Sequence, residues 1–253
     1  MNNAVAIARK ELKVYFSSPL FYVITALFVL VTGLFFALTI LSPNATGNQT
    51  DNLRSTFNTT LFVMIFLAPL LTMRLISQEK QEGTMELLMT QPVTDTEVVL
   101  GKYLASLAMF GAMFVTTLLQ VLVLMIAAVD KHKLLFINIG DIDTSTLIAG
   151  YIGNILILGG YLSLGLLASA LTNNQIIAAL ISFVLLLSLL VVDTAAQFAQ
   201  PPVSDFLSHV GPRSHADAFA RGLVTAPDVI YAVSMIALPL FLTVVVLGAR
   251  RWR

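Results

Sequence analysis

Six long apolar runs, separated by shorter polar segments, dominate this amino-acid sequence. They cover residues 20–41, 57–75, 98–129, 147–171, 176–192 and 229–248. A helix of about 20 apolar residues is long enough to cross the hydrocarbon core of a bilayer. Because no water reaches the backbone there, its hydrogen bonds must close within each segment, which favours helices. The runs therefore predict an all-α, polytopic membrane protein with six transmembrane helices in a single domain, residues 1–253.

The composition excludes several other classes of protein. The chain is 57% hydrophobic and 11% charged, whereas soluble domains average about 45–50% apolar and about 25% charged residues. Its net charge of zero gives no reason to expect a nucleic-acid partner. The absence of cysteine removes disulfides, thiolate metal ligands and cysteine nucleophiles. The first apolar run exceeds a signal-peptide core and lacks a small-residue cleavage site after it, so we expect it to be retained.

The distribution of Lys and Arg predicts the orientation of the chain. Six spans place both termini on one side, which would hold nine of the 14 basic residues: Arg9, Lys10, Lys13, Arg74, Lys80, Lys102, Arg250, Arg251 and Arg253. The other side would hold the remaining five: Arg54, Lys131, Lys133, Arg213 and Arg221. Loops on the cytoplasmic side carry an excess of Lys and Arg. We therefore expect both termini to be cytoplasmic.

Residues 1–18 have the pattern of a helix lying on the membrane surface. Apolar residues at 3.6-residue spacing form one face of this helix: Val5, Ala8, Leu12, Tyr15 and Phe16. Arg9 and Lys13 flank that face, as expected where acyl chains meet headgroups. Pro19 pushes Ser18 out of helical conformation, which favours a separate interfacial helix. The alternative is an N-terminal extension of the first span.

The stretch "EKQEGTMELLMTQPVT", residues 79–94, concentrates charge between two apolar runs. Four charged residues fall within eight positions: Glu79, Lys80, Glu82 and Glu86. On a helix the three glutamates share one sector, beside a stripe formed by Met85, Leu88 and Met89. Pro92 ends the pattern, so we expect a short amphipathic helix over residues 79–92. Anionic lipid repels an acidic face, which favours a protein partner with a basic or polar groove. The alternative is a solvated interhelical loop.

Two further segments carry local structural signals. Thr94 and Glu97 form a capping box, with Val93 and Val98 as a hydrophobic staple, so the third long helix begins before the membrane. Residues 193–227 combine prolines, apolar residues and scattered charges, and predict short external helices that re-enter the outer leaflet. Irregular backbone at that depth must be covered by neighbouring spans or by a second subunit.

The pattern of polar residues gives little support to catalysis or ion coupling. No nucleophile with a base and an orienting group is present, and Tyr103 follows Gly101-Lys102, so the phosphate-binding G-x-x-x-x-G-K-[ST] motif is missing. His209 and His215 with nearby aspartates are a weak alternative pattern for copper or zinc, and we expect no metal. Gln120 and Asn154 are candidate pathway residues, with interhelical hydrogen bonding as the alternative.

The charged stretch also carries a family resemblance. "EKQEGTMELLMTQPVTDTEVVLGKYL", residues 79–104, resembles the cytoplasmic loop of ABC-2 type transporter permeases. The similarity is greatest to the gliding-motility-associated branch, to which the nitrous-oxide-reductase maturation permeases are related. Four further segments resemble the family in the same order along the chain: "YFSSP" at 15–19, "APLLTMR" at 68–74, "GLLASALTNNQ" at 165–175 and "HADAFARG" at 215–222.

This resemblance implies a function and a set of partners. The chain would be the permease subunit of an ATP-driven exporter in the bacterial inner membrane, without a cofactor or enzymatic activity of its own. Its partners would be an ABC ATP-binding subunit that holds ATP and Mg²⁺, a second identical or related permease, and an auxiliary periplasmic or membrane protein. The 79–92 helix would be the coupling helix, with Glu79 among its coupling residues and with these residues on the family pattern: Glu82, Gly83, Thr84, Glu86, Leu87 and Leu88. The alternatives are an anchoring or signalling subunit of an ATPase-driven machine and an ion-coupled carrier.

Overall fold

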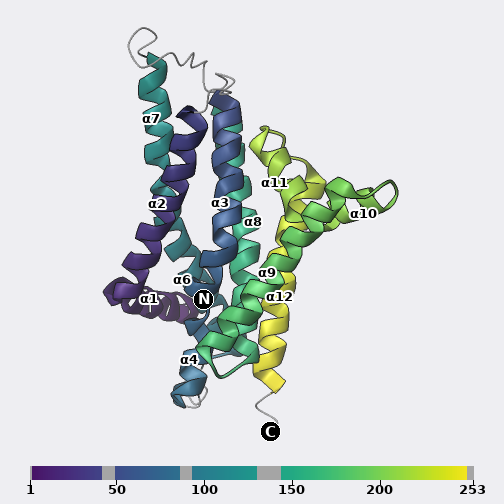
Figure 1. Ribbon diagram of the computed structural model, residues 1–253. Coiled ribbons are helices and arrows are strands. Elements are labelled where there is room, and N and C mark those ends of the chain that lie inside the picture. The colour runs from purple at the N-terminus through teal and green to yellow at the C-terminus, as the bar shows by residue number, and fades with distance from the viewer. Residues whose placement is uncertain (1, 42–48, 86–92, 130–143, 250–253) are drawn as a thin grey trace.

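The computed structural model describes residues 2–41, 49–85, 93–129 and 144–249, and its regular elements there are all helices (Figure 1). Six stretches are long and apolar enough to cross a bilayer: Pro19–Leu41, Asp51–Gln81, Asp95–Val123, Ser145–Leu171, Gln175–Phe198 and Ala226–Gly248. The prediction of an all-α protein with six membrane-spanning helices is therefore confirmed. The first, fourth and sixth stretches lie close to the apolar runs of the sequence.

The second and third spans are each built from two helices. The second consists of α3 (Gln49–Thr72) and α4 (Arg74–Gln81), and the third of α6 (Asp95–Val115) and α7 (Thr117–Val129). At the third-span break, the N–H of Thr116 donates to the carbonyl of Met113, three residues back, over 3.1 Å. This tighter turn interrupts the α-helical hydrogen-bond ladder.

Two spans extend beyond the apolar runs that predicted them. Helix α3 already includes Asp51–Thr56, which lie before the second apolar run, because Arg54 forms an ion pair with Asp217 that holds this polar turn. Helix α9 (Gln175–Phe198) continues past residue 192 and includes Asp193, whose carboxylate accepts a backbone hydrogen bond from Arg213. Both extensions depend on polar partners that are distant in sequence.

Helices α3 and α8 (Thr144–Leu171) form the centre of the bundle. Buried residues make up 67% and 72% of an apolar 18-residue stretch in their spans, compared with 17% for both α9 and α12 (Ala226–Gly248). Helix α2 (Pro19–Leu41) packs against α3, and α12 packs against α8. The outer spans therefore present mainly apolar surface, as expected of helices that face lipid or another subunit.

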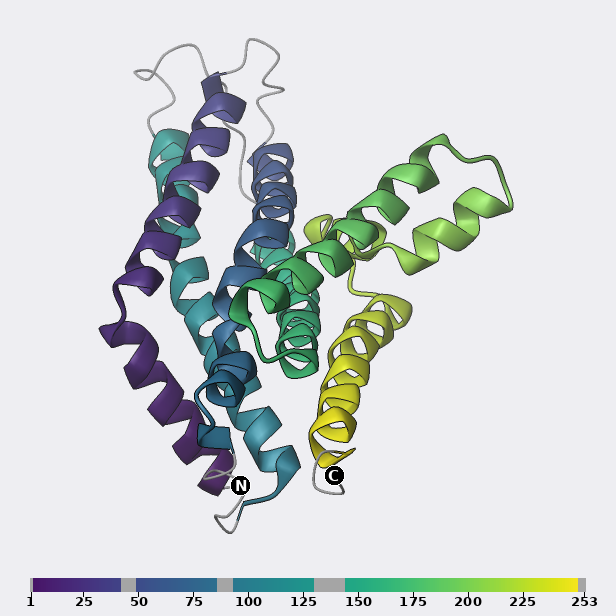
Figure 2. The ribbon, with the colours of Figure 1, turned by 60° about the horizontal axis from the view of Figure 1, so that its bottom comes forward.

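The two ends of the bundle carry different short elements. Helix α1 (Asn2–Ser17), helix α4 and the end of α12 lie at one end (Figures 1 and 2). Helices α10 (Val203–Val210) and α11 (Pro212–Ala220) form a hairpin between α9 and α12 that projects from the other half. Within residues 193–227 the structure thus contains α10 and α11, while residues 193–198 belong to α9 and residues 226–227 to α12.

Candidate functional site: the α1–α4–α6 end of the bundle

Helix α1 packs along α6 and reaches α4 through an ion pair between Lys10 and Glu79. Its buried residues recur with helical spacing on one face: Ala4, Ala8, Glu11 and Tyr15. The Tyr15 hydroxyl donates to the backbone carbonyl of Leu71 in α3 over 2.9 Å. Burial, and to a lesser extent the Glu11 carboxylate, raises the pKa of Tyr15, so the hydroxyl remains protonated and able to donate.

This docking divides the apolar face predicted for residues 1–18. Ala8 and Tyr15 are buried and Leu12 packs against the core, whereas Val5 and Phe16 remain exposed. Arg9 and Lys13 are exposed as well. The helix therefore has one face on the protein and a second, narrower apolar face that remains available to a membrane surface. Hydrophobic spacing alone did not distinguish the two faces.

A buried ion cluster joins α1, α4 and α6. Lys102 of α6 is 1% exposed, and its Nζ lies 2.9 Å from Glu11 Oε1 and 2.9 Å from Glu79 Oε1. Lys10 approaches Glu79 Oε1 at 3.5 Å from the solvent side. The charge of a buried lysine must be compensated, and two carboxylates from two other helices do so here. Glu79 therefore faces the protein interior and not a solvent-exposed acidic stripe.

Helix α4 is capped at its start by a side chain of α8. The N-cap residue Met73 makes no side-chain capping bond of its own. Instead, the Ser169 hydroxyl accepts from the N–H groups of Ile76 and Ser77 at 3.1 and 3.0 Å and donates to the carbonyl of Met73 at 2.9 Å. These bonds satisfy groups that a helix start leaves unpaired. The Lys80 ammonium donates to the carbonyl of Ala170, which adds a second tie to α8.

The tip that follows α4 is solvent-exposed. Helix α4 ends at Gln81, and Gly83 adopts φ +71°, a left-handed conformation that interrupts the single helix predicted over residues 79–92. Glu82 and Thr84 are exposed beside it, whereas Met85 is buried. Three predicted coupling residues lie outside the residues that the structure describes: Glu86, Leu87 and Leu88.

The capping box predicted at the start of the third span is confirmed. The Glu97 N–H donates to Thr94 Oγ1 at 3.3 Å, and the Thr94 N–H donates to Glu97 Oε2 at 3.1 Å. The Asn3 amide of α1 also donates to Glu97, at 3.3 Å. The cap therefore also helps to hold α1 against α6.

The two candidate pathway residues make hydrogen bonds inside the bundle. Gln120 of α7 donates to Thr32 Oγ1 of α2 over 3.3 Å, which is the interhelical bond given as the alternative. Asn154 is 1% exposed and donates to the carbonyl of Gly150 in its own helix over 3.2 Å. Neither residue lines the cavity of about 650 Å³ that the structure shows between α2, α3, α8, α9 and α11.

His215 fastens the α10–α11 hairpin to the start of α12. Its Nδ1 lies 2.6 Å from Asp228 Oδ1, its Nε2 lies 3.2 Å from the carbonyl oxygen of His209, and its ring stacks on Tyr231. Both ring nitrogens therefore contact protein oxygen atoms. The His209 side chain turns back to the carbonyl of Asp205 in its own helix. His215 therefore has a structural role, because it connects α11 to α10 and to the start of α12.

One known protein family matches nearly the whole chain. The family described as ABC-2 family transporter protein matches residues 5–252 of this sequence. The chain belongs to the ABC-2 transporter family. This assignment and the six apolar helices identify a multi-pass membrane protein that is the permease subunit of an ABC transporter. A search of curated protein sequences finds no match to this ABC-2 permease.

Proposed function

We propose that this permease is driven by a separate ABC ATPase that docks on the tip after α4. The observation that carries the proposal is the exposed Glu82–Thr84 turn at the end of a helix tied to three neighbours. Lys102 joins α4 to α1 and α6, and Ser169 joins it to α8. A force applied to the tip is therefore transmitted to several helices, as a coupling element requires.

The mechanism follows from this connectivity. ATP and Mg²⁺ bind on the partner ATPase, whose closure displaces the α4 tip. The displacement tilts the second and third spans and alternately exposes a pathway between two permease subunits, which exports the substrate. The exposed spans α9 and α12 supply apolar surface for a second subunit or lipid. An auxiliary periplasmic or membrane protein completes the assembly.

The same proposal includes the localisation and the branch of the family. We place the chain in the bacterial inner membrane, with α1, α4 and the C-terminal end of α12 on the cytoplasmic side where the ATPase lies. The order of the motifs from residue 15 to residue 222 supports the gliding-motility-associated branch.

Reversal of charge at the tip tests the docking site. The Glu82→Lys variant, alone and with Glu86→Lys, should lower co-purification of the ATPase by one to a few orders of magnitude in affinity. Hydrogen bonds to charged groups contribute about 1.5–3 kcal/mol each, and a lysine adds repulsion from a basic groove. ATP hydrolysis linked to the permease should fall in parallel.

Asp205→Lys on α10 is the matched control, because Asp205 is also exposed but lies on the hairpin of the other half. It should leave ATPase recovery unchanged. Equal recovery and equal hydrolysis for wild type, Glu82→Lys and the double variant would contradict docking at this tip.

A further inference from the structure

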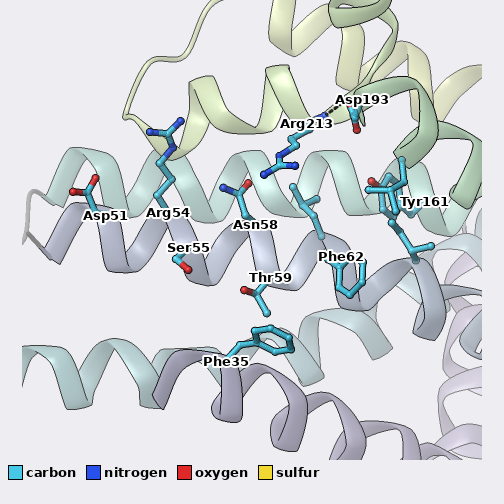
Figure 3. A pocket seen from close by; sticks show the side chains of 13 residues that line it. Phe35, Asp51, Arg54, Ser55, Asn58, Thr59, Phe62, Tyr161, Asp193 and Arg213 are labelled. Atoms are coloured by element: carbon cyan, nitrogen blue, oxygen red, sulfur yellow. Dashed lines mark hydrogen bonds between the residues drawn. The ribbon is translucent and has the colours of Figure 1, made fainter. Parts of the chain in front are cut away.

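The cavity of about 650 Å³ in the half of the bundle away from α1 has an amphipathic lining. Its volume lies within the range of about 300–1,000 Å³ that is typical of small-molecule sites. Polar residues of α3 line one part: Asp51, Arg54, Ser55, Asn58 and Thr59. Asp193 of α9 lines the same cavity. Aromatic rings, Phe35 of α2 and Phe62 of α3, line the adjoining part and remain partly exposed (Figure 3).

The polar stripe on α3 is unusual for a membrane-spanning helix. Residues 54, 55, 58 and 59 share one face, are only partly buried, and fall within the second span, Asp51–Gln81. Polar side chains in a membrane-spanning helix are costly when they face lipid, and they commonly line a site or a pathway. One turn further along the same face, Phe62 replaces the polar residues. The stripe therefore changes from polar to apolar along the helix.

Arg213 supplies a positive charge at the polar part of this cavity. Its side chain is exposed and forms no ion pair with a described residue, and Figure 3 shows it extending from α11 toward Asn58. Arg54, by contrast, is held by Asp217 in a two-pronged ion pair. Among the described residues that line the cavity, Arg213 is thus the cation that forms no ion pair, and guanidinium groups bind phosphate and carboxylate well.

The backbone beside Arg213 is held in a defined position. Its N–H donates to Asp193 Oδ1 of α9 over 3.2 Å, and Asp193 is 8% exposed. A Cβ at Gly211 would lie 1.9 Å from the same carboxylate oxygen, so only glycine allows the α10–α11 corner to close on α9. This anchoring holds the backbone of Arg213 beside the cavity. The guanidinium of Arg213 forms no ion pair with the Asp193 carboxylate. Preorganised donors bind at lower entropic cost.

We propose that this cavity binds an amphiphile with an anionic head, such as an alkyl phosphate or a lipid with a phosphate headgroup. The head contacts Arg213 and the hydroxyl and amide donors of α3, and the chain lies along Phe62 and Phe35. Its use as the entry site for the transported substrate rests on the proposed function, whereas binding itself does not.

Equilibrium binding of radiolabelled dodecyl phosphate to the full-length protein in phosphatidylcholine nanodiscs tests the proposal, with empty nanodiscs as background. Arg213→Gln should weaken binding by roughly tenfold to hundredfold, because a loss of this size is expected when a hydrogen bond to a charged group is removed. Arg213→Lys should keep most of the affinity. Arg221→Gln is the matched control, since Arg221 is exposed near the end of the same helix and does not line the cavity.

Two competitors identify the ligand class. Unlabelled octyl phosphate should compete more weakly than dodecyl phosphate, by about fourfold for each methylene that the cavity buries. Dodecyl maltoside and inorganic phosphate should compete poorly, because each lacks one half of the ligand. Equal competition by dodecyl maltoside would overturn the anionic head, and equal competition by inorganic phosphate would overturn the amphiphile. Unchanged binding by Arg213→Gln would overturn the site.

A second readout separates this proposal from the ATPase proposal. The binding measurement uses the permease without an ATPase, so it stands even if Glu82→Lys retains full ATPase recovery. Conversely, loss of dodecyl phosphate binding in Arg213→Gln with normal ATPase recovery would locate the effect in the cavity. Thermal unfolding of each variant at neutral pH shows whether the fold is intact. Phe62→Ser is an independent variant, which should lower the affinity for dodecyl phosphate more than the affinity for octyl phosphate.

Discussion

Lys102 shows how strongly a single residue can depend on its surroundings in this fold. It is buried in a mostly apolar bundle, and Glu11 and Glu79 from two different helices compensate its charge. Removal of one member of a buried ion pair is far more costly than replacement of all members together, because it leaves a charge without a partner. The cluster is therefore a sensitive point for stability at the α1–α4–α6 end.

Lys102→Met should destabilise the protein by about 3–5 kcal/mol, since two carboxylates lose their common cation. Thermal unfolding in detergent measures the loss. Lys13→Met, at an exposed position of α1, should stay within about 0.5 kcal/mol of wild type. The triple variant with Glu11→Gln and Glu79→Gln should recover much of the stability. Destabilisation of the triple variant beyond Lys102→Met alone would refute this account.

The ion pair between α3 and α11 predicts a pH dependence. Burial raises the pKa of Asp217, but the guanidinium groups of Arg54 and Arg221 outweigh it and hold this pKa below its usual range. A carboxyl with a lowered folded-state pKa stabilises the fold above its unfolded pKa of about 3.9 and loses that contribution as pH falls through the folded value. When the pH is lowered from 7 to 3, the unfolding temperature of Asp217→Asn should therefore fall by less than that of wild type. Asp205→Asn, on the exposed face of α10, should follow wild type.

At the scale of elements, the end of α4 depends on two unusual local features. Ser169 of α8 caps its start from another helix, and Gly83 ends the helix in a left-handed turn. Both determine the direction in which the exposed tip leaves the bundle.

Gly83→Ala should impair the tip without a steric clash. No atom lies within 4 Å of a Cβ at this position, so the cost arises from the φ of +71° and amounts to about 1–2 kcal/mol. We expect reduced ATPase-linked hydrolysis with the spans still folded. Gly111→Ala is the control, since its Cβ also meets nothing within 4 Å but its φ is ordinary and it lies inside α6. That variant should be neutral or slightly more stable. Equal hydrolysis in both variants would rule out a role for the turn.

On the scale of the whole molecule, the two ends of the bundle should lie on opposite sides of the membrane. Gln81 is exposed at the end of α4, whereas Gly222 lies against Thr146 at the start of α8, near the other end. The chain contains no cysteine, so single cysteines report cleanly. In intact cells an impermeant thiol reagent should label Val224→Cys and should label Gln81→Cys only after permeabilisation. The reverse pattern would overturn the cytoplasmic placement of α1 and α4.

The spans and their starting signals could be predicted from the sequence because they depend on local energetics. Hydrophobic length determines where a helix can cross a bilayer, and Thr94 with Glu97 caps α6 through residues three positions apart. The same local patterns did not predict that Asp51–Thr56 and Asp193 continue their helices. Those turns are stabilised by Asp217 and Arg213, which belong to another part of the chain.

The sequence by itself determined the six spans, the short helix at the N-terminus and the presence of a charged segment between the second and third spans. Only the tertiary structure decided which of those charges face the protein. Glu79 pairs with Lys102, and Lys102 with Glu11 at a separation of 91 positions. The tertiary structure also brings Arg213 to the cavity that the polar face of α3 lines. Helical periodicity reports which residues share a face, but burial of a charge depends on whether a distant opposite charge reaches it. That condition is met only when the helices pack.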